Sequence, residues 1–118
     1  MTMAYEIVDA KYVEDHLGKM PLIDVRPHEM YVDGRIPGAK NVELMATKEE
    51  GGDVAKHMAE KVEALGIKPS DDIIVYCRDG ILTKEASDLL DSEGFDHIHA
   101  YVGSWWDWVS DPSRPVEK

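Results

Sequence analysis

The chain has 118 residues, of which 43% are hydrophobic and 31% are charged, and it carries a formal net charge of -11. This length allows one ordinary domain with a single core, and the composition is typical of a soluble globular protein without membrane-spanning segments. The acidic balance argues against general nucleic-acid binding, which requires clustered Lys and Arg.

The amino end is neither basic nor apolar, so it predicts no secretory signal, and we expect a cytoplasmic location.

Short apolar runs alternate with longer mixed segments in the amino-terminal half. In chain order we expect a strand over 5–8, a helix that follows Asp9 and reaches residue 17, a strand over 21–25, a brief helix over 27–32 and a strand over 39–42. Asp9 suits a helix N-cap because its side chain can accept a backbone N–H.

The carboxyl-terminal half continues this alternation. We expect an amphipathic helix over 53–65, a strand over 73–76, a helix over 83–92, a strand over 97–102 and an irregular tail from about residue 111. The three tryptophans, Trp105, Trp106 and Trp108, are expected to pack in the core or against helices. The alternation predicts an α/β fold with a central, mostly parallel five-stranded sheet flanked by helices on both faces, in one domain over residues 1–118.

Cys77 is the only cysteine, and it stands at the carboxyl end of the most apolar predicted strand. A single cysteine excludes an intramolecular disulfide and a cysteine-built zinc site. The chain then passes through Gly80 into a helix, whose N-terminus would offer unpaired N–H groups and a positive dipole end that stabilise a thiolate. From these residues alone, Cys77 is either a reactive thiol or a small apolar residue that ends a core strand.

An acidic chain repels small anions at long range, so an anionic substrate would need local positive groups at its site. Arg26, Arg35 and Arg78 are the candidates. His97 and His99 share one face of a predicted strand, but no third ligand is evident, so we expect no metal site and no other cofactor.

Three segments of the chain resemble the sequence signatures of rhodanese domains. They are residues 22–26 with 34–42, residues 74–80, and residues 101–108 with 115–117. Because they occur in the family's order and span nearly the whole chain, the sequence is similar to the thiosulfate and mercaptopyruvate sulfurtransferases. The resemblance implies a rhodanese-like fold and a sulfur-transfer activity.

The resemblance also implies roles for individual residues. Cys77 would be the nucleophile that carries sulfane sulfur as a persulfide. Its active-site loop would comprise Arg78, Asp79, Gly80, Ile81, Leu82 and Thr83. Arg26 and Arg78 would bind a small anionic donor such as thiosulfate, while Asp24 would support the loop by accepting backbone hydrogen bonds. The acceptor would be cyanide, a thiol or a protein, with no role for nucleic acid or membrane.

Asp79 departs from the family pattern, because thiosulfate-using members often carry Lys at this position and mercaptopyruvate-using members carry Ser. A carboxylate there would disfavour thiosulfate, so the resemblance leaves the donor open.

Several other functions are alternatives to sulfur transfer between small molecules. A cysteine phosphatase or arsenate reductase needs an Arg six positions after the cysteine to bind its oxyanion, and here that residue is Thr83. A non-catalytic interaction or regulatory module could use the same fold, since fold does not fix function. The presence of Cys77 and of a loop of the family's length favours catalysis, and a relay of sulfur to a protein is a further alternative.

Overall fold

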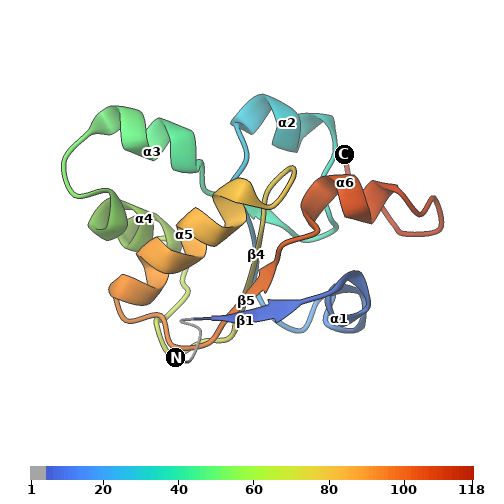
Figure 1. The fold of residues 1–118 in the computed structure, drawn as a ribbon, viewed down its shortest axis with the longest axis horizontal. Coiled ribbons are helices and arrows are strands. Elements are labelled where there is room, and N and C mark those ends of the chain that lie inside the picture. Colours follow the sequence, from blue (N-terminus) through green and yellow to red (C-terminus); the bar gives the residue numbers. More distant parts are fainter. Residues whose placement is uncertain (1–4) are drawn as a thin grey trace.

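The computed structural model of the protein describes residues 5–118, and its centre is a parallel five-stranded sheet in the order β1-β5-β4-β2-β3 (Figure 1). The strands are β1 (Glu6–Val8), β2 (Leu22–Asp24), β3 (Lys40–Asn41), β4 (Ile73–Tyr76) and β5 (Ile98–Tyr101). The helices are α1 (Ala10–Asp15), α2 (His28–Asp33), α3 (Leu44–Glu50), α4 (Val54–Glu63), α5 (Ile81–Ser92) and α6 (Ser104–Val109). The predicted α/β class is therefore confirmed.

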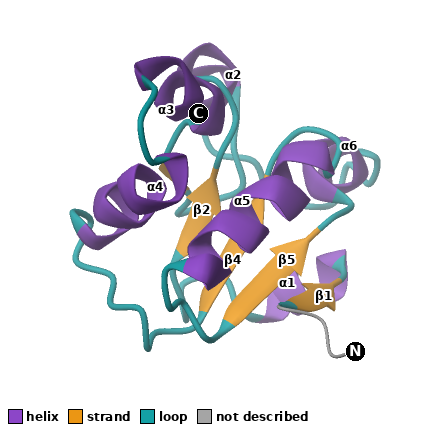
Figure 2. Ribbon diagram, turned by 60° about the vertical axis from the view of Figure 1, so that its left-hand side comes forward, coloured by secondary structure: helices purple, strands orange, loops and turns teal. Residues whose placement is uncertain are grey.

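The central strand β4 is buried on both faces. Ile73 and Val75 belong to the core that α3, α4 and α5 share with the sheet, whereas Ile74 and Tyr76 belong to the core on the side of α1 and α6. Figure 2 shows α5 crossing one side of the sheet, with α1 on the other. A parallel strand covered on both faces has no solvent side, which explains why its sequence is a continuous apolar run.

Two helices of the structure, α3 and α6, were not predicted from the sequence. α3 is a short helix after β3, and α6 carries the three tryptophans directly after β5. Helix α5 begins at Ile81 rather than at Thr83, because Gly80 adopts a left-handed conformation with φ of 99° and turns the loop into the helix at once. The predicted N-cap is confirmed, since the Asp9 side chain accepts the Tyr12 N–H at 2.9 Å.

Part of the prediction about the amino end concerns residues 1–4, which lie outside the described residues. Among the helices of residues 5–118, none is both long enough and apolar enough to cross a membrane.

The carboxyl-terminal tail forms no helix or strand within residues 111–118, but it is attached to the body of the protein. Arg35 and Glu117 exchange two backbone hydrogen bonds of 2.9 Å as an isolated antiparallel bridge. The Glu117 carboxylate accepts the Gly38 N–H at 2.7 Å and lies 3.3 Å from the Arg35 guanidinium. The hydrogen bond from Gly38 lowers the pKa of Glu117, with a further contribution from Arg35.

Candidate active site

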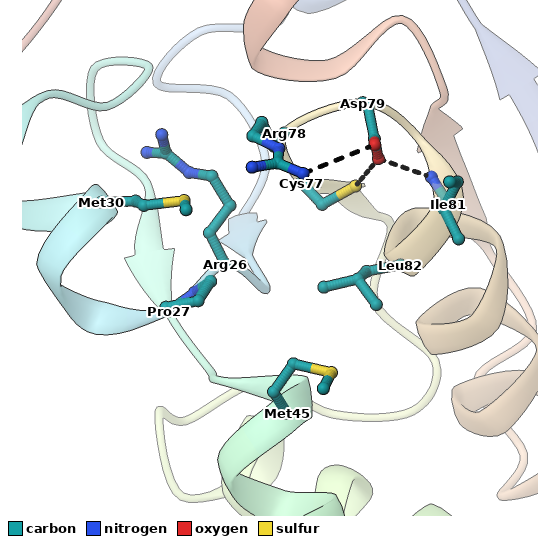
Figure 3. Close-up of a pocket in the computed structure, with 9 residues that line it drawn as sticks. All are labelled: Arg26, Pro27, Met30, Met45, Cys77, Arg78, Asp79, Ile81 and Leu82. Carbon is teal, nitrogen blue, oxygen red and sulfur yellow. Dashed lines mark hydrogen bonds and ion pairs between the residues drawn. The ribbon is translucent and has the colours of Figure 1, made fainter.

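Cys77 follows directly after β4 and forms part of a cavity of about 290 Å³ at the carboxyl ends of the strands (Figure 3). In open parallel sheets this edge is where ligands bind. The thiol side chain is only 1% exposed, so it lies at the inner end of the cavity. The lining residues are Arg26, Pro27, Met30, Met45, Cys77, Arg78, Asp79, Ile81 and Leu82.

The Cys77 sulfur has three polar neighbours. The Gly80 N–H donates a hydrogen bond to Sγ at 3.1 Å, the Ser104 hydroxyl oxygen lies 3.7 Å from it, and Asp79 Oδ1 lies 4.0 Å from it. The amide belongs to the residue that precedes α5, so the sulfur sits at the positive end of a 12-residue helix. The Gly80 amide at this position can stabilise negative charge on sulfur.

Gly80 is required in this loop for two reasons. Its φ of 99° lies in the left-handed region, which side chains disfavour. In addition, a Cβ at this position would overlap the carbonyl oxygen and the side chain of Val102. The loop therefore approaches the backbone after β5 more closely than any other residue type would allow.

Ser104, the first residue of α6, contacts the cysteine, and the sequence did not identify it. Its hydroxyl accepts the Cys77 N–H at 3.1 Å, donates to the Tyr101 carbonyl at 2.9 Å and lies 3.1 Å from the Thr83 hydroxyl. A signal existed: Ser104 follows the end of β5 as Cys77 follows the end of β4, and these parallel strands are adjacent. Ser104 has φ of 61°, the one non-glycine residue with positive φ among residues 5–118.

The first turn of α6 holds the backbone of the cysteine loop. The Trp105 N–H donates to the Cys77 carbonyl at 2.9 Å, and the Trp106 N–H donates to the Arg78 carbonyl at 3.0 Å. These two bonds use N–H groups that a helix otherwise leaves unpaired in its first turn. They fix the loop against the sheet.

Arg26 lies beside the cavity, but its guanidinium is engaged elsewhere. The side chain is 2% exposed, and it donates to the Asp24 carboxylate at 2.7–3.0 Å and to the Gly34 carbonyl at 2.7 Å. Figure 3 shows the guanidinium pointing away from the sulfur of Cys77, and its carbon lies 4.7 Å from the centre of the Trp105 ring. The expected role of Arg26 in binding an anionic donor therefore stays a prediction, and these contacts do not favour it.

Asp24 is fully buried and organises this polar cluster. Its carboxylate accepts the backbone N–H of Arg26 at 2.9 Å, a backbone hydrogen bond of the kind expected from the sequence, and it also accepts the Tyr76 hydroxyl at 2.6 Å. The Tyr76 oxygen in turn accepts the Ile36 N–H at 3.2 Å. Burial, together with the Asp24 charge, raises the pKa of Tyr76, which remains protonated.

Arg78 and Asp79 form the rim next to the sulfur. The Arg78 side chain is 50% exposed, lies over the Trp106 ring at 5.0 Å and has its Nη2 atom 3.9 Å from Asp79 Oδ2. Asp79 Oδ1 accepts the Ile81 N–H at 3.2 Å. Trp106 is thus an exposed partner of Arg78, not the packed residue expected, whereas Trp108 is fully buried.

The remaining predicted loop residues occupy different depths. Ile81 is 71% exposed at the cavity rim, Leu82 lines the cavity, and Thr83 is fully buried against Ser104. Thr83 thus offers no positive group for an oxyanion. Arg35, a third cation noted in the sequence, pairs with Glu117 instead of lining the cavity.

Two methionines, Met30 and Met45, line the cavity although no feature of the sequence marked them. Met30 lies on α2 and Met45 on α3, and α3 was not predicted from the sequence.

The described residues contain no cluster of three or more His, Cys, Asp or Glu side chains placed to hold a metal ion. His99, one of the two strand histidines, lies with Nε2 2.9 Å from Asp72 Oδ1 and with Nδ1 3.3 Å from Glu6 Oε1.

Comparison with known proteins identifies relatives of this chain. Residues 9–111 match the family model of the rhodanese-like domain. The chain is 33% identical over 90 residues to the thiosulfate sulfurtransferase of Azotobacter vinelandii, a match that covers 71% of this chain and 32% of that protein. It is 29% identical over 126 residues to the probable 3-mercaptopyruvate sulfurtransferase of Pseudomonas aeruginosa, covering 93% of this chain and 44% of that protein. The chain therefore spans less than half the length of these two relatives.

The solved structures include close matches to the fold. The human single-domain sulfurtransferase TSTD1 superimposes with a TM-score of 0.72 at 26% identity, covering 89% of this chain and 96% of that one. The Alr3790 protein from Anabaena superimposes with a TM-score of 0.75 at 25% identity, covering 93% of this chain and 81% of that one.

Proposed function

We propose, because this chain belongs to the rhodanese-like domain family and is related to sulfurtransferases, that Cys77 carries a sulfur atom as a persulfide between a donor and an acceptor. The observation that supports this proposal most directly is the 3.1 Å hydrogen bond from the Gly80 N–H to the Cys77 sulfur. We further propose that residues 1–118 form one such domain.

In the first half of the reaction, the Cys77 thiolate attacks the sulfane sulfur of the donor. A bond forms between Sγ and that sulfur while the donor's bond to it breaks, and the leaving group departs with the electron pair. With thiosulfate the leaving group is sulfite, and Cys77 is left as a persulfide anion. This is covalent catalysis of the ping-pong type.

In the second half, the acceptor attacks the outer sulfur of the persulfide. The bond between Sγ and the outer sulfur breaks, and Sγ recovers the electron pair as a thiolate. With cyanide the product is thiocyanate, and with a thiol it is an organic persulfide. Negative charge returns to Sγ in this step, where the Gly80 N–H stabilises it without rearrangement.

The test is to incubate the protein with a panel of sulfane donors and to measure its intact mass. We expect Cys77 to gain one sulfur atom and to lose it again when an acceptor is added. Cys77→Ser is the matched variant, because its hydroxyl is small enough for the same site and leaves the chain without a thiol. We expect turnover to fall by on the order of 10³-fold or more with the thermal unfolding midpoint nearly unchanged. Failure of every donor to add sulfur, or residual turnover of the variant near the wild-type rate, would exclude the proposed nucleophile.

A further inference from the structure

The Asp79 carboxylate makes the site beside Cys77 a poor cradle for a small multiply charged anion. Its Oδ1 atom lies 4.0 Å from the sulfur and accepts the Ile81 N–H. An N–H at the start of α5 that would otherwise be available to an anion is therefore already used within the protein. A negative charge also stands beside the reacting atom, and like charges repel strongly where water is partly excluded.

The two arginines that line the cavity compensate this charge incompletely. Arg26 donates through Nε and Nη2 to Asp24 and to the Gly34 carbonyl, so its charge is balanced by the buried Asp24 carboxylate. Arg78 is shared between Asp79 at 3.9 Å and the Trp106 ring at 5.0 Å. One arginine thus faces one carboxylate near the sulfur, and no excess positive charge remains there for a dianion.

The size and lining of the cavity point to an organic ligand. Its volume is about 290 Å³, and Pro27, Met30, Met45, Ile81 and Leu82 form an apolar wall. A water molecule takes up about 30 Å³ in the liquid, so an inorganic oxyanion would fill only a small part of this space. Methionine side chains are flexible and polarisable, and they adapt to ligands that contain apolar groups or sulfur.

We propose that Asp79 is a specificity-determining residue that directs this site to organic thiols and persulfides with an apolar body and no additional anionic group near the reacting sulfur. The inference rests on the proposed function, because it concerns the donor and acceptor of the Cys77 persulfide. It disfavours both thiosulfate and thiols that carry a carboxylate next to the sulfur.

With such a donor the transfer is balanced without a further reagent. The Cys77 thiolate attacks the outer sulfur of R–S–SH and forms the new S–S bond, while the S–S bond of the donor breaks. RS⁻ leaves with the electron pair and takes up the proton that Cys77 lost.

The test compares sulfur loading of Cys77 by donors of matched size and different charge. Mercaptoethanol persulfide has no charged group besides the persulfide itself and is called the uncharged donor below. Mercaptoacetate persulfide carries a carboxylate in addition, and thiosulfate is a dianion. We expect the wild type to prefer the uncharged donor over the carboxylate donor by about tenfold in kcat/KM. Benzyl persulfide tests the apolar wall, and we expect Met45→Ala to lower the preference for benzyl over mercaptoethanol persulfide about fivefold.

The decisive variant is Asp79→Asn, which removes the charge and keeps an oxygen that can accept the Ile81 N–H. We expect it to bring the charged and uncharged donors within about twofold of each other. Asp71→Asn is the control, because Asp71 also accepts a backbone N–H, from Lys68 at 2.8 Å, but lies before β4, at the opposite end of the strand from Cys77. This control is expected to keep the wild-type preference.

The outcomes separate the two proposals. If thiosulfate and mercaptoacetate persulfide load the wild type as fast as the uncharged donor does, and Asp79→Asn leaves the ratio unchanged, the specificity proposal is wrong although Cys77 carries sulfur. If no donor of any charge loads Cys77, the proposed function itself fails. Preference for the uncharged donor that disappears in Asp79→Asn and persists in Asp71→Asn supports the inference.

Discussion

Two groups of Asp and Arg residues lie beside the same cavity, and they are built in opposite ways. In the first, Asp24 and Arg26 are buried and paired with each other, and they make further hydrogen bonds to Tyr76 and to the Gly34 carbonyl. In the second, Arg78 is half exposed, and its nearest carboxylate atom, on Asp79, is 3.9 Å away. Only in the second group are the two charged side chains loosely paired.

The difference indicates that one group has a structural role and that the other can interact with a substrate. A buried and closely hydrogen-bonded ion pair fixes the ends of β2 and β4 in one arrangement, because any change would leave a charge unpaired in the interior. The loop after β4 keeps a cation and an anion near the sulfur with incomplete pairing, and such groups can respond to a substrate. Residue type alone therefore does not tell a structural arginine from a functional one.

The largest effect on stability is expected from Asp24→Asn, which tests the difference between the buried and the exposed pair. The substitution leaves the buried guanidinium of Arg26 without its counter-charge, and we expect it to lower the free energy of unfolding by about 3 kcal/mol. Urea unfolding monitored by tryptophan fluorescence measures this change. Asp79→Asn is the matched control from the exposed loop, where we expect a change of at most about 0.5 kcal/mol. Equal losses from the two substitutions would refute the distinction.

A smaller effect is expected from Gly80→Ala, which tests the loop itself. The added methyl group would overlap the Val102 carbonyl, so the loop must shift and the Gly80 N–H must move away from the sulfur. We expect a loss of about 1–2 kcal/mol in stability and a fall in the rate of sulfur loading of at least about tenfold.

Gly94→Ala provides the control for backbone strain. Gly94 has φ of 92°, close to that of Gly80, but an added Cβ would meet no heavy atom within 4 Å. We expect a similar conformational cost of about 1 kcal/mol and an unchanged rate of sulfur loading. A rate that falls equally in both variants would mean that the contact with Val102 does not matter.

The smallest effect concerns the exposed pair between the tail and the body, which extends the comparison to a third ion pair. Because the Gly38 N–H lowers the pKa of Glu117 in the folded protein, the carboxylate stabilises the fold above its unfolded pKa. This contribution is lost as the pH falls through the lowered pKa. We expect Glu117→Gln to melt slightly below the wild type at about pH 6 and the difference to close by about pH 3. A difference that stays constant with pH would contradict this role.

Much of the architecture could be predicted from the sequence, because the buried strands are recognisable as short, continuous apolar runs. The run from Ile73 to Tyr76 is apolar at every position, and a strand covered on both faces requires this. The two missed helices lack such a signal. α3 has only seven residues, and α6 has six, three of which are tryptophans, a residue type with weak helix propensity. Both are stabilised by tertiary contacts, α3 through Leu44 in the core and α6 through Trp108 in the core and its hydrogen bonds to the cysteine loop.

The site was predictable where it is local in sequence and unpredictable where it is not. Cys77 and its loop follow a strand directly, so the chain order alone brings them to the edge of the sheet. Ser104 is 27 residues from Cys77, and only the pairing of β4 with β5 places its hydroxyl on the cysteine. The direction of the Arg26 side chain likewise depends on Asp24 and the Gly34 carbonyl, a tertiary arrangement that no local pattern reports.

The backbone of Ser104 has a consequence for how this domain can change over time. With φ of 61°, the position suits glycine better than any residue that has a side chain, so substitution by glycine would relieve the backbone. Glycine would also remove the hydroxyl that holds the Cys77 N–H and lies against the sulfur. Relief of the backbone is worth at most about 1 kcal/mol, whereas a buried N–H left without an acceptor costs about 1–3 kcal/mol. Stability and the geometry of the cysteine loop therefore both favour serine at this position, in spite of its backbone.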